Sequence, residues 1–240
     1  MRDSDQTMCG RFIQISDPEK IRLRVSEIEI SPEIPSVVKP RYNIAPAQNI
    51  LTVLNYRVPT LAYTRWGLVP SWAEDISMGS RMINARAETL LEKPSFKRPL
   101  RKNRCIIFAD GFYEWKKARD SKIPYFIGLK DSEPFGLAGL WDQWTDRTTG
   151  AKIFSSTIIT TSPNDLIRDI HNRMPVILDP NDYQTWLSVK GMPDDVFMAC
   201  LKTYPSDRMD AYEISLAVNS PANDSPALIE PCAPVTDRLF

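Results

Sequence analysis

Residues 105–115 read Cys-Ile-Ile-Phe-Ala-Asp-Gly-Phe-Tyr-Glu-Trp: an apolar run, an Asp-Gly pair, and a second run rich in aromatic residues. β-branched and aromatic residues bounded by turn residues are typical of strands, so this stretch predicts strands at 105–109 and 112–115. Further runs of the same character lie at 51–56, 61–66, 124–129, 135–141 and 153–161. Because these strands follow one another without long helices between them, the pattern indicates a mixed, largely antiparallel α+β domain.

Capping signals predict two short helices outside this run of strands. Ser16-Asp-Pro-Glu19 has the spacing of a capping box with proline in the first turn, which predicts a helix over 17–27. Ser162-Pro-Asn-Asp165 repeats the device and predicts a helix over 163–170. The second helix would place His171 at its C-terminal end, where the helix dipole favours the protonated imidazole.

The composition is that of an ordinary soluble globular protein. The chain has 240 residues, 42% of them hydrophobic and 25% charged, which suits one domain or two small ones. Its apolar runs are far shorter than the roughly 20 residues that a membrane-spanning helix needs. The polar, acidic segment that precedes Cys9 has no apolar core of a signal peptide. We therefore expect a cytoplasmic protein that does not cross a membrane.

Cysteine and histidine usage argues against a metal centre. The four cysteines, at 9, 105, 200 and 232, are scattered and contain no Cys-x-x-Cys pair, so neither a zinc site nor a disulfide framework is indicated. The single histidine, His171, points the same way, because protein metal sites draw heavily on imidazole. The expectation is a protein without metal or organic cofactor.

Charge is balanced overall, with 30 basic and 30 acidic residues, but it is unevenly distributed. Residues 81–104 carry eight basic side chains against Glu88 and Glu92, while residues 179–213 carry seven acidic side chains against three basic ones. A local excess of positive charge is what a phosphate-binding face requires. A solvated basic loop and helix explains the same excess equally well.

Several side chains have the chemistry of a functional site, and each also has an ordinary structural explanation. Glu114 is flanked by aromatic residues that would raise its pKa if it were buried, although it could be a surface residue. His171 titrates near neutral pH or is a structural histidine. Asn84 and Arg86 could bind a phosphate or oxyanion, or act as a cap and a surface residue. Trp66 and Trp72 could stack on bases or pack in the core.

Cys9 has a special chemistry if the chain starts at Met8. Removal of Met8 would then leave Cys9 with an α-amine and a thiol on one residue. The amine can condense with an aldehyde to a Schiff base, and the thiol can then close a thiazolidine ring, which is covalent nucleophilic catalysis. The ordinary alternative is a small buried cysteine.

Seven ordered motifs span the chain. They are Met8-Cys-Gly-Arg-Phe12, Arg41-Tyr-Asn-Ile-Ala-Pro46, Trp66-Gly-Leu-Val-Pro-Ser-Trp72, Asn84-Ala-Arg-Ala-Glu88, Ala109-Asp-Gly-Phe-Tyr-Glu-Trp115, Ile170-His-Asn-Arg-Met-Pro175 and Val218-Asn-Ser-Pro221. In this order and spacing the chain closely resembles the SOS response-associated peptidase (SRAP) family, whose domain shields abasic sites in single-stranded DNA. The resemblance implies one α+β domain over 9–230, with mainly antiparallel sheets in a distorted barrel-like core and peripheral helices, between an N-terminal extension, 1–8, and a tail, 231–240.

The resemblance also implies roles for individual residues. Cys9 would link covalently to the ring-opened abasic sugar, Asn84 would hold the sugar, Glu114 would exchange protons with the N-terminal amine, and His171 would assist ring opening and Schiff-base chemistry. The residues that would grip phosphates or wedge the kinked strand are Arg11, Pro46, Trp72, Arg86, Thr160 and Arg173. The implied partner is single-stranded DNA containing abasic sites, bound by a monomer without metal or cofactor and associated with the nucleoid when on DNA.

One departure bears on activity. Seven residues precede Met8, so Cys9 gains a free amine only if the start lies at Met8 or if the extension is removed, for example by the self-cleavage that gives the family its name. Crosslinking to DNA, with self-cleavage and a lyase step as accompanying activities, is the first hypothesis. The alternatives are a thiol peptidase acting on proteins, with Cys9 as nucleophile and His171 as base, and a non-catalytic single-strand-binding module.

Overall fold

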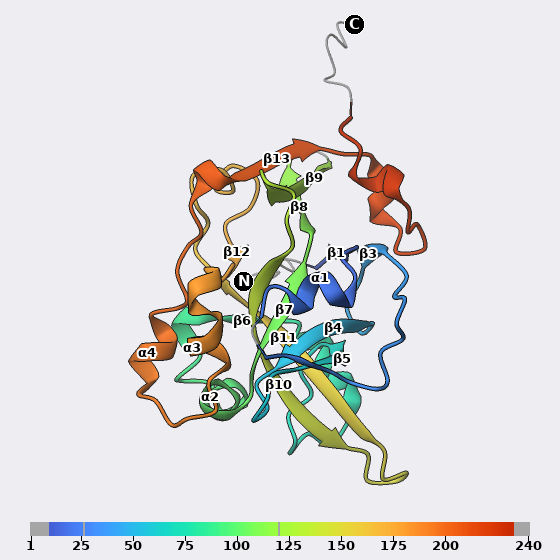
Figure 1. Ribbon diagram of the computed structural model, residues 1–240. Helices are drawn as coiled ribbons and strands as arrows, with labels where there is room; N and C mark the ends of the chain where they lie inside the picture. The colour runs from blue at the N-terminus through green and yellow to red at the C-terminus, as the bar shows by residue number, and fades with distance from the viewer. Residues whose placement is uncertain (1–9, 26, 120, 233–240) are drawn as a thin grey trace, which may run out of the picture.

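The computed structural model describes residues 10–25, 27–119 and 121–232, and in this part of the chain thirteen strands form two sheets (Figure 1). All pairings in the five-stranded sheet are antiparallel. Its strand order is β13 (Met209–Glu213), β9 (Lys122–Leu129), β8 (Gly111–Lys117), β1 (Phe12–Gln14) and β3 (Arg41–Ile44).

The eight-stranded sheet closes on itself. Its order is β12 (Met174–Pro175), β11 (Lys152–Thr161), β10 (Phe135–Thr145), β7 (Arg104–Ala109), β4 (Asn49–Leu54), β5 (Thr60–Trp66) and β2 (Glu29–Ile30), with β6 (Asn84–Arg86) paired to β11. A short parallel pairing of β5 with β11 at Ser155 and Ser156 joins the two ends of the path β5-β4-β7-β10-β11. These five strands therefore form a distorted barrel, which confirms the α+β fold predicted from the sequence.

The central strand β7 explains why its sequence is an unbroken apolar run. Successive side chains of a strand point to opposite faces, and both faces of β7 are covered. Ile106 and Phe108 join the apolar cluster that includes Trp186 and Phe197, whereas Cys105 and Ile107 join the one that includes Phe12 and Trp66. The strand thus contributes to two cores at once.

The four α-helices of the described residues are short: α1 (Pro18–Arg22), α2 (Pro94–Lys102), α3 (Tyr183–Leu187) and α4 (Asp194–Met198). Helices α2, α3 and α4 cluster on one side of the barrel (Figure 1). No helix in the described ranges is both long and apolar enough for a membrane span.

Both predicted helices need correction. The first begins at Pro18, one residue after the expected start. Its N-cap is Asp17, whose side chain accepts from the Lys20 amide, whereas the Ser16 hydroxyl donates to Asp110 instead. It ends at Arg22 rather than residue 27, where Glu27 has a left-handed φ of 57°. The predicted helix over 163–170 is a series of turns. The buried Asn164 side chain accepts from the Ile167 amide and donates to the Tyr204 carbonyl. Backbone bonds from Arg168 to the Asn164 carbonyl and from His171 to the Ile167 carbonyl close separate turns rather than a continuous helix.

Two buried polar side chains join the parts of the fold. Gln14 of β1 donates to the carbonyls of Leu51 and Phe108 at 2.9 and 2.7 Å, which ties the open sheet to the barrel. Arg104 of β7 is fully buried and donates to the carbonyl oxygens of Leu100, Trp186 and Ser188. Its guanidinium also lies 3.6 Å from the centre of the Phe197 ring, and burial lowers the pKa of Arg104 to about 10. Arg104 thereby fixes α2 and α3 to the barrel.

Candidate functional site

Glu114 and His171 line one cavity of about 460 Å³, although they are 57 residues apart in the sequence. Glu114 belongs to β8, and its side chain lies beside Trp115 in the cavity wall. The remaining wall is formed by Ser121, Lys122, Leu216 and Asn219. The structure therefore brings together two of the residues that the sequence singled out for proton transfer.

Glu114 is a buried carboxyl group that lies between the aromatic residues Tyr113 and Trp115 of β8. Only 2% of its surface is exposed, which rules out the surface position considered above. Strand β1 runs antiparallel to it: Phe12 pairs with Phe112, and the Tyr113 amide donates to the Arg11 carbonyl at 3.0 Å. Continued by one residue, this register brings Gly10 level with Glu114. Cys9, which follows Gly10 toward the N-terminus, lies outside the described residues, as do residues 1–8.

His171 differs from its expected state. With no helix before it, no helix dipole favours its protonated form, and burial lowers the pKa of His171 below its ordinary value of 6.5, with the charge of Lys122 acting in the same direction. The Arg173 amide donates to His171 Nδ1 at 3.2 Å. Because Nδ1 accepts, the neutral ring carries its proton on Nε2. His171 is thus a neutral donor near pH 7.

A second group of predicted residues lies where β6, β11 and β12 meet. Strand β6 pairs with β11 in parallel, placing Asn84 opposite Ile158 and Arg86 opposite Thr160. Arg86 is exposed, whereas Thr160 is fully buried. Since Thr160 also pairs with Pro175 of β12, the segment that carries His171 and Arg173 leads directly into this junction.

Arg173 is already engaged by protein groups. Its guanidinium donates to both carboxylate oxygens of Glu88 at 2.6 and 2.8 Å and to the Thr160 carbonyl at 2.7 Å. The side chain of Arg173 is 13% exposed and that of Glu88 50%, and the hydrogen bonds from Arg173 lower the pKa of Glu88. Glu88 is therefore ionised at neutral pH and occupies the face of Arg173 that an anion would use.

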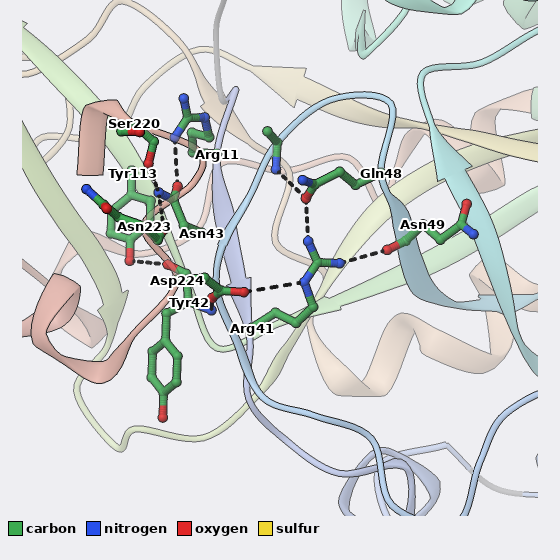
Figure 2. A network of polar contacts seen from close by, with 11 residues as sticks. Arg11, Arg41, Tyr42, Asn43, Gln48, Asn49, Tyr113, Ser220, Asn223 and Asp224 are labelled. Atoms are coloured by element: carbon green, nitrogen blue, oxygen red, sulfur yellow. Dashed lines mark hydrogen bonds and ion pairs between the residues drawn. The ribbon is translucent and has the colours of Figure 1, made fainter. Parts of the chain in front are cut away.

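Arg11 lies in a different network, which Figure 2 shows together with Asn43 and Arg41. Its guanidinium donates to Asn43 Oδ1 at 2.7 Å and to the carbonyls of Val218 and Asn219 at 2.8 and 3.1 Å. The Asn43 amide group also donates to the carbonyls of Val218, Ser220 and Asn223. Arg11 thus holds the segment that contributes Asn219 to the cavity against the start of β1.

The tryptophans separate into a core residue and a surface residue. Trp66 is 1% exposed, and its indole donates to the Ile83 carbonyl at 3.0 Å, so it is unable to stack on a base. Trp72 is 55% exposed on the turn that follows. The partly exposed Pro46 lies near the same segment, because the next residue, Ala47, donates its amide to the Trp66 carbonyl at 2.8 Å.

The turn that carries Trp72 starts at a glycine for which no other residue substitutes readily. Gly67 has a φ of 120°, and a Cβ at this position would lie 2.6 Å from the Gly79 carbonyl oxygen. A side chain would therefore clash with the backbone of η1 (Ile76–Arg81). This close approach fixes the path of the chain from Trp66 to Trp72.

The sequence did not single out four residues of the cavity wall: Ser121, Lys122, Leu216 and Asn219. Asn219 lies within a quoted motif, and its side-chain oxygen accepts from the Trp115 indole at 2.8 Å. Ser121 and Lys122 stand at the start of β9 and carry no motif; β9 pairs with β8, with Lys122 opposite Lys117, and the folded chain brings them into the cavity wall that Glu114 also lines. Among the described residues, no group of three or more His, Cys, Asp and Glu side chains is positioned to hold a metal ion.

The chain is similar in sequence and in fold to several known proteins. The abasic site processing protein YoqW of Bacillus subtilis is 48% identical over 225 residues, covering 93% of this chain and 99% of the relative. The abasic site processing protein YoaM of the same organism is 45% identical over 226 residues, covering 93% and 98%. A crystal structure of a protein from Bacteroides thetaiotaomicron superposes with a TM-score of 0.83 at 28% identity, covering 94% and 100%.

The fold and the site define an α+β protein with a buried glutamate–histidine cavity at the edge of a distorted barrel. The family model described as SOS response associated peptidase (SRAP) matches residues 8–221. The chain belongs to this family.

Proposed function

We propose that this protein recognises abasic sites in single-stranded DNA and caps them covalently through Cys9. The observation that carries the proposal is the cavity that Glu114 and His171 share. Strand β1 pairs with β8, and the chain that precedes β1 continues along β8 toward Glu114. The names of the relatives, abasic site processing proteins, supply the substrate class. An abasic site exposes an aldehyde once its sugar ring opens, and an N-terminal cysteine is suited to capture an aldehyde.

The covalent chemistry has two steps. The unprotonated amine of Cys9 attacks the aldehyde carbon, and loss of one water leaves a Schiff base. The thiol sulfur then bonds to the imine carbon while its proton passes to the nitrogen, which closes a thiazolidine ring. Glu114, as a carboxylate, accepts the proton that the attacking amine releases and returns it as water leaves. Neither step changes the total oxidation state, so the reaction needs no oxidant and no external cofactor.

His171 acts earlier, on the closed sugar. The abasic sugar exists mainly as a ring whose oxygen must be protonated before the aldehyde forms. A neutral imidazole with its proton on Nε2 can hydrogen-bond to the ring oxygen and pass that proton to it in step with the loss of the sugar hydroxyl proton to the imidazole, so that the ring of His171 stays neutral. In this scheme Asn84 binds the sugar with its amide. Asn84 lies on β6, which pairs with β11, and β11 also pairs with β12, the strand that follows His171 in the chain.

DNA binding is assigned to the surface around this cavity. Arg86 supplies an exposed cation beside Thr160, and Trp72 with Pro46 supplies a surface against which a kinked strand can turn. Arg11 and Arg173 are assigned to the same strand, and both also hold protein groups in place. Phosphate contacts of this kind position the strand without reading its sequence.

The proposal requires a free amine on Cys9, so the active protein is expected to lack residues 1–8. Intact-mass measurement of the purified protein should show a chain that starts at Cys9. The same sample, incubated with an abasic strand, an intact strand and a protein substrate, should give a heat-stable adduct on a denaturing gel with the abasic strand alone. Full crosslinking by a chain that retains Met1 contradicts the mechanism, and cleavage of the protein substrate without an adduct identifies a thiol peptidase instead.

Glu88 is expected to restrain DNA binding, because its carboxylate holds the face of Arg173 that a phosphate would use. Glu88→Gln removes the negative charge and keeps a side chain of similar shape. We expect tighter binding of single strands and a salt dependence steeper by about 0.7 in log K against log salt, the value of one added contact. Anisotropy titrations over a range of salt concentrations measure both. Weaker binding by Glu88→Gln would instead make the Glu88–Arg173 pair purely structural.

A further inference from the structure

Helix α2 and its N-cap present a row of exposed basic side chains that the proposed chemistry does not use. They are Lys93, Lys97, Arg98, Arg101 and Lys102. An open groove of about 460 Å³ runs along them, lined by Glu92, Pro94, Lys97, Arg98, Arg101 and Lys102. Between Lys93 and Lys102 the chain contains no acidic residue.

Acidic neighbours neutralise part of this row and leave the rest. Arg101 forms a bidentate pair with Asp194, with a shortest distance of 2.6 Å, and Arg98 lies 3.6 Å from the buried Asp142. Throughout the described ranges, Lys93, Lys97 and Lys102 form no ion pair. The charge of Lys97 also helps to lower the pKa of Asp194, after the hydrogen bonds from Arg101, but all three lysine side chains are exposed on α2 and its N-cap.

The helix is joined to the DNA-binding surface at two points. Arg98 Nη1 donates to Ser71 Oγ at 3.1 Å, and Ser71 is the residue before the exposed Trp72. The buried Asp142 strengthens this junction, because it accepts from the Ser71 amide at 2.9 Å as well as facing Arg98. A strand that turns at Trp72 would therefore meet the basic row directly.

The second connection runs through the backbone. Arg86 ends β6, the short helix η2 (Ala87–Thr89) follows, and the Lys93 amide donates to the Thr89 carbonyl at 3.1 Å. Helix α2 is also held firmly from beneath, since Phe96 and Leu100 are buried and the fully buried Arg104 donates to the Leu100 carbonyl at 2.6 Å. The lysines are thus displayed on a rigid element next to Arg86.

The charge and spacing of the basic side chains on α2 indicate which kind of ligand they bind. Regularly spaced cations attract a polyanion, and the exposed large apolar side chains of the described chain include none from α2, so the helix can neither stack bases nor enter a lipid surface. Continuity with Trp72 and Arg86 favours nucleic acid over an acidic peptide. We infer that α2 binds the phosphodiester backbone of the single strand that flanks the abasic site, which extends the footprint beyond the cavity; this inference rests on the proposed function.

Strand length separates this surface from the site itself. Anisotropy titrations would use strands that carry a stable abasic analogue without an aldehyde, so that no crosslink forms. One strand has about 6 nucleotides, near the lower end of single-strand site sizes, and the other about 20. The combined variant Lys93→Ala, Lys97→Ala, Lys102→Ala should bind the short strand like the unaltered protein. On the long strand its salt slope should fall by about 2, since each single-strand contact contributes about 0.7.

Matched variants make the result specific. Lys130→Ala, Lys152→Ala, Lys190→Ala removes three exposed lysines elsewhere and should leave the long-strand slope unchanged. Replacement of the three α2 lysines by arginine should preserve it. An unchanged slope in the α2 variant, an equal fall in the control, or an equal loss on the short strand would each overturn the inference. A fall seen only with duplex-flanked strands would assign α2 to a duplex and also overturn it.

Crosslinking provides an independent readout of the proposed function. The α2 variant should crosslink a short strand with a true abasic site at the unaltered rate, because none of its three lysines lines the Glu114–His171 cavity. Failure of the unaltered protein to crosslink that strand would contradict the proposed chemistry, whereas the effect of strand length on non-covalent binding would still test α2.

Discussion

Cys9→Ala is expected to abolish the heat-stable DNA adduct while leaving a weaker, reversible one. With residues 1–8 absent, alanine still offers an α-amine, so a Schiff base with the abasic aldehyde can form. Without a thiol the ring cannot close, and water reverses the imine. Denaturing gels should therefore show an adduct from the variant only after borohydride reduction. The expected loss of unreduced adduct is complete, which makes this the most direct test of the chemistry.

Cys9→Ser serves as the matched control, because its hydroxyl has nearly the shape of the thiol and is a far weaker nucleophile at neutral pH. It should resemble the alanine variant. Intact-mass measurement must show that each variant starts at residue 9, since a retained extension would block the amine and mimic loss of the thiol. Heat-stable, unreduced adduct at the unaltered yield from Cys9→Ala would refute thiazolidine formation.

The strands were predictable from the sequence because their signal is local. All seven predicted strands are present, and β7 starts one residue before the predicted 105–109 and ends where predicted. Closure of the barrel was expected only from the family resemblance. It depends on the parallel contact of β5 with β11, which joins residues about 90 positions apart and has no local signature.

The helix predictions were wrong about the end of the first helix and about the presence of the second. The capping signal that starts at Ser16 gave the start of α1 to within one residue, although Asp17 is the N-cap, and it carried no information about the end of the helix. The same kind of signal after Ser162 was misleading, because the chain there forms separate turns, in which the Asn164 side chain bonds to Ile167 and Tyr204. That error also reversed the expected charge of His171, since the pKa argument depended on a helix dipole that does not exist.

The sequence predicted which residues belong to the site, but it did not predict how they are arranged in space. Motif spacing identified Glu114 and His171, and only the fold shows that they share a cavity. Arg11 and Arg173 illustrate the limit, because a sequence marks them as cations without showing that each already binds carbonyl or carboxylate oxygens. Lys122 had no motif at all, and its place in the cavity follows from the β8–β9 hairpin.

Glu114 and His171 are assigned different proton transfers, and two substrates can separate them. His171→Ala should slow crosslinking to a closed abasic sugar by about 100-fold, the low end of general acid–base catalysis. It should have little effect on a strand that carries a non-cyclic aldehyde, which needs no ring opening. Glu114→Gln should slow both substrates to a similar extent, because both pass through attack by the Cys9 amine.

The pH dependence follows from the same assignment. An α-amine has a reference pKa of about 7.7 to 8.0, so the rate with the non-cyclic aldehyde should rise with pH and level off above that range. Burial lowers the pKa of His171 below 6.5, so its neutral, Nε2-protonated form predominates where the amine titrates, and the midpoint of its own titration lies at lower pH. Initial crosslinking rates against pH, for both substrates and all three proteins, measure this. Equal loss on both strands by His171→Ala would remove its role in ring opening and leave it a structural or DNA-contacting residue.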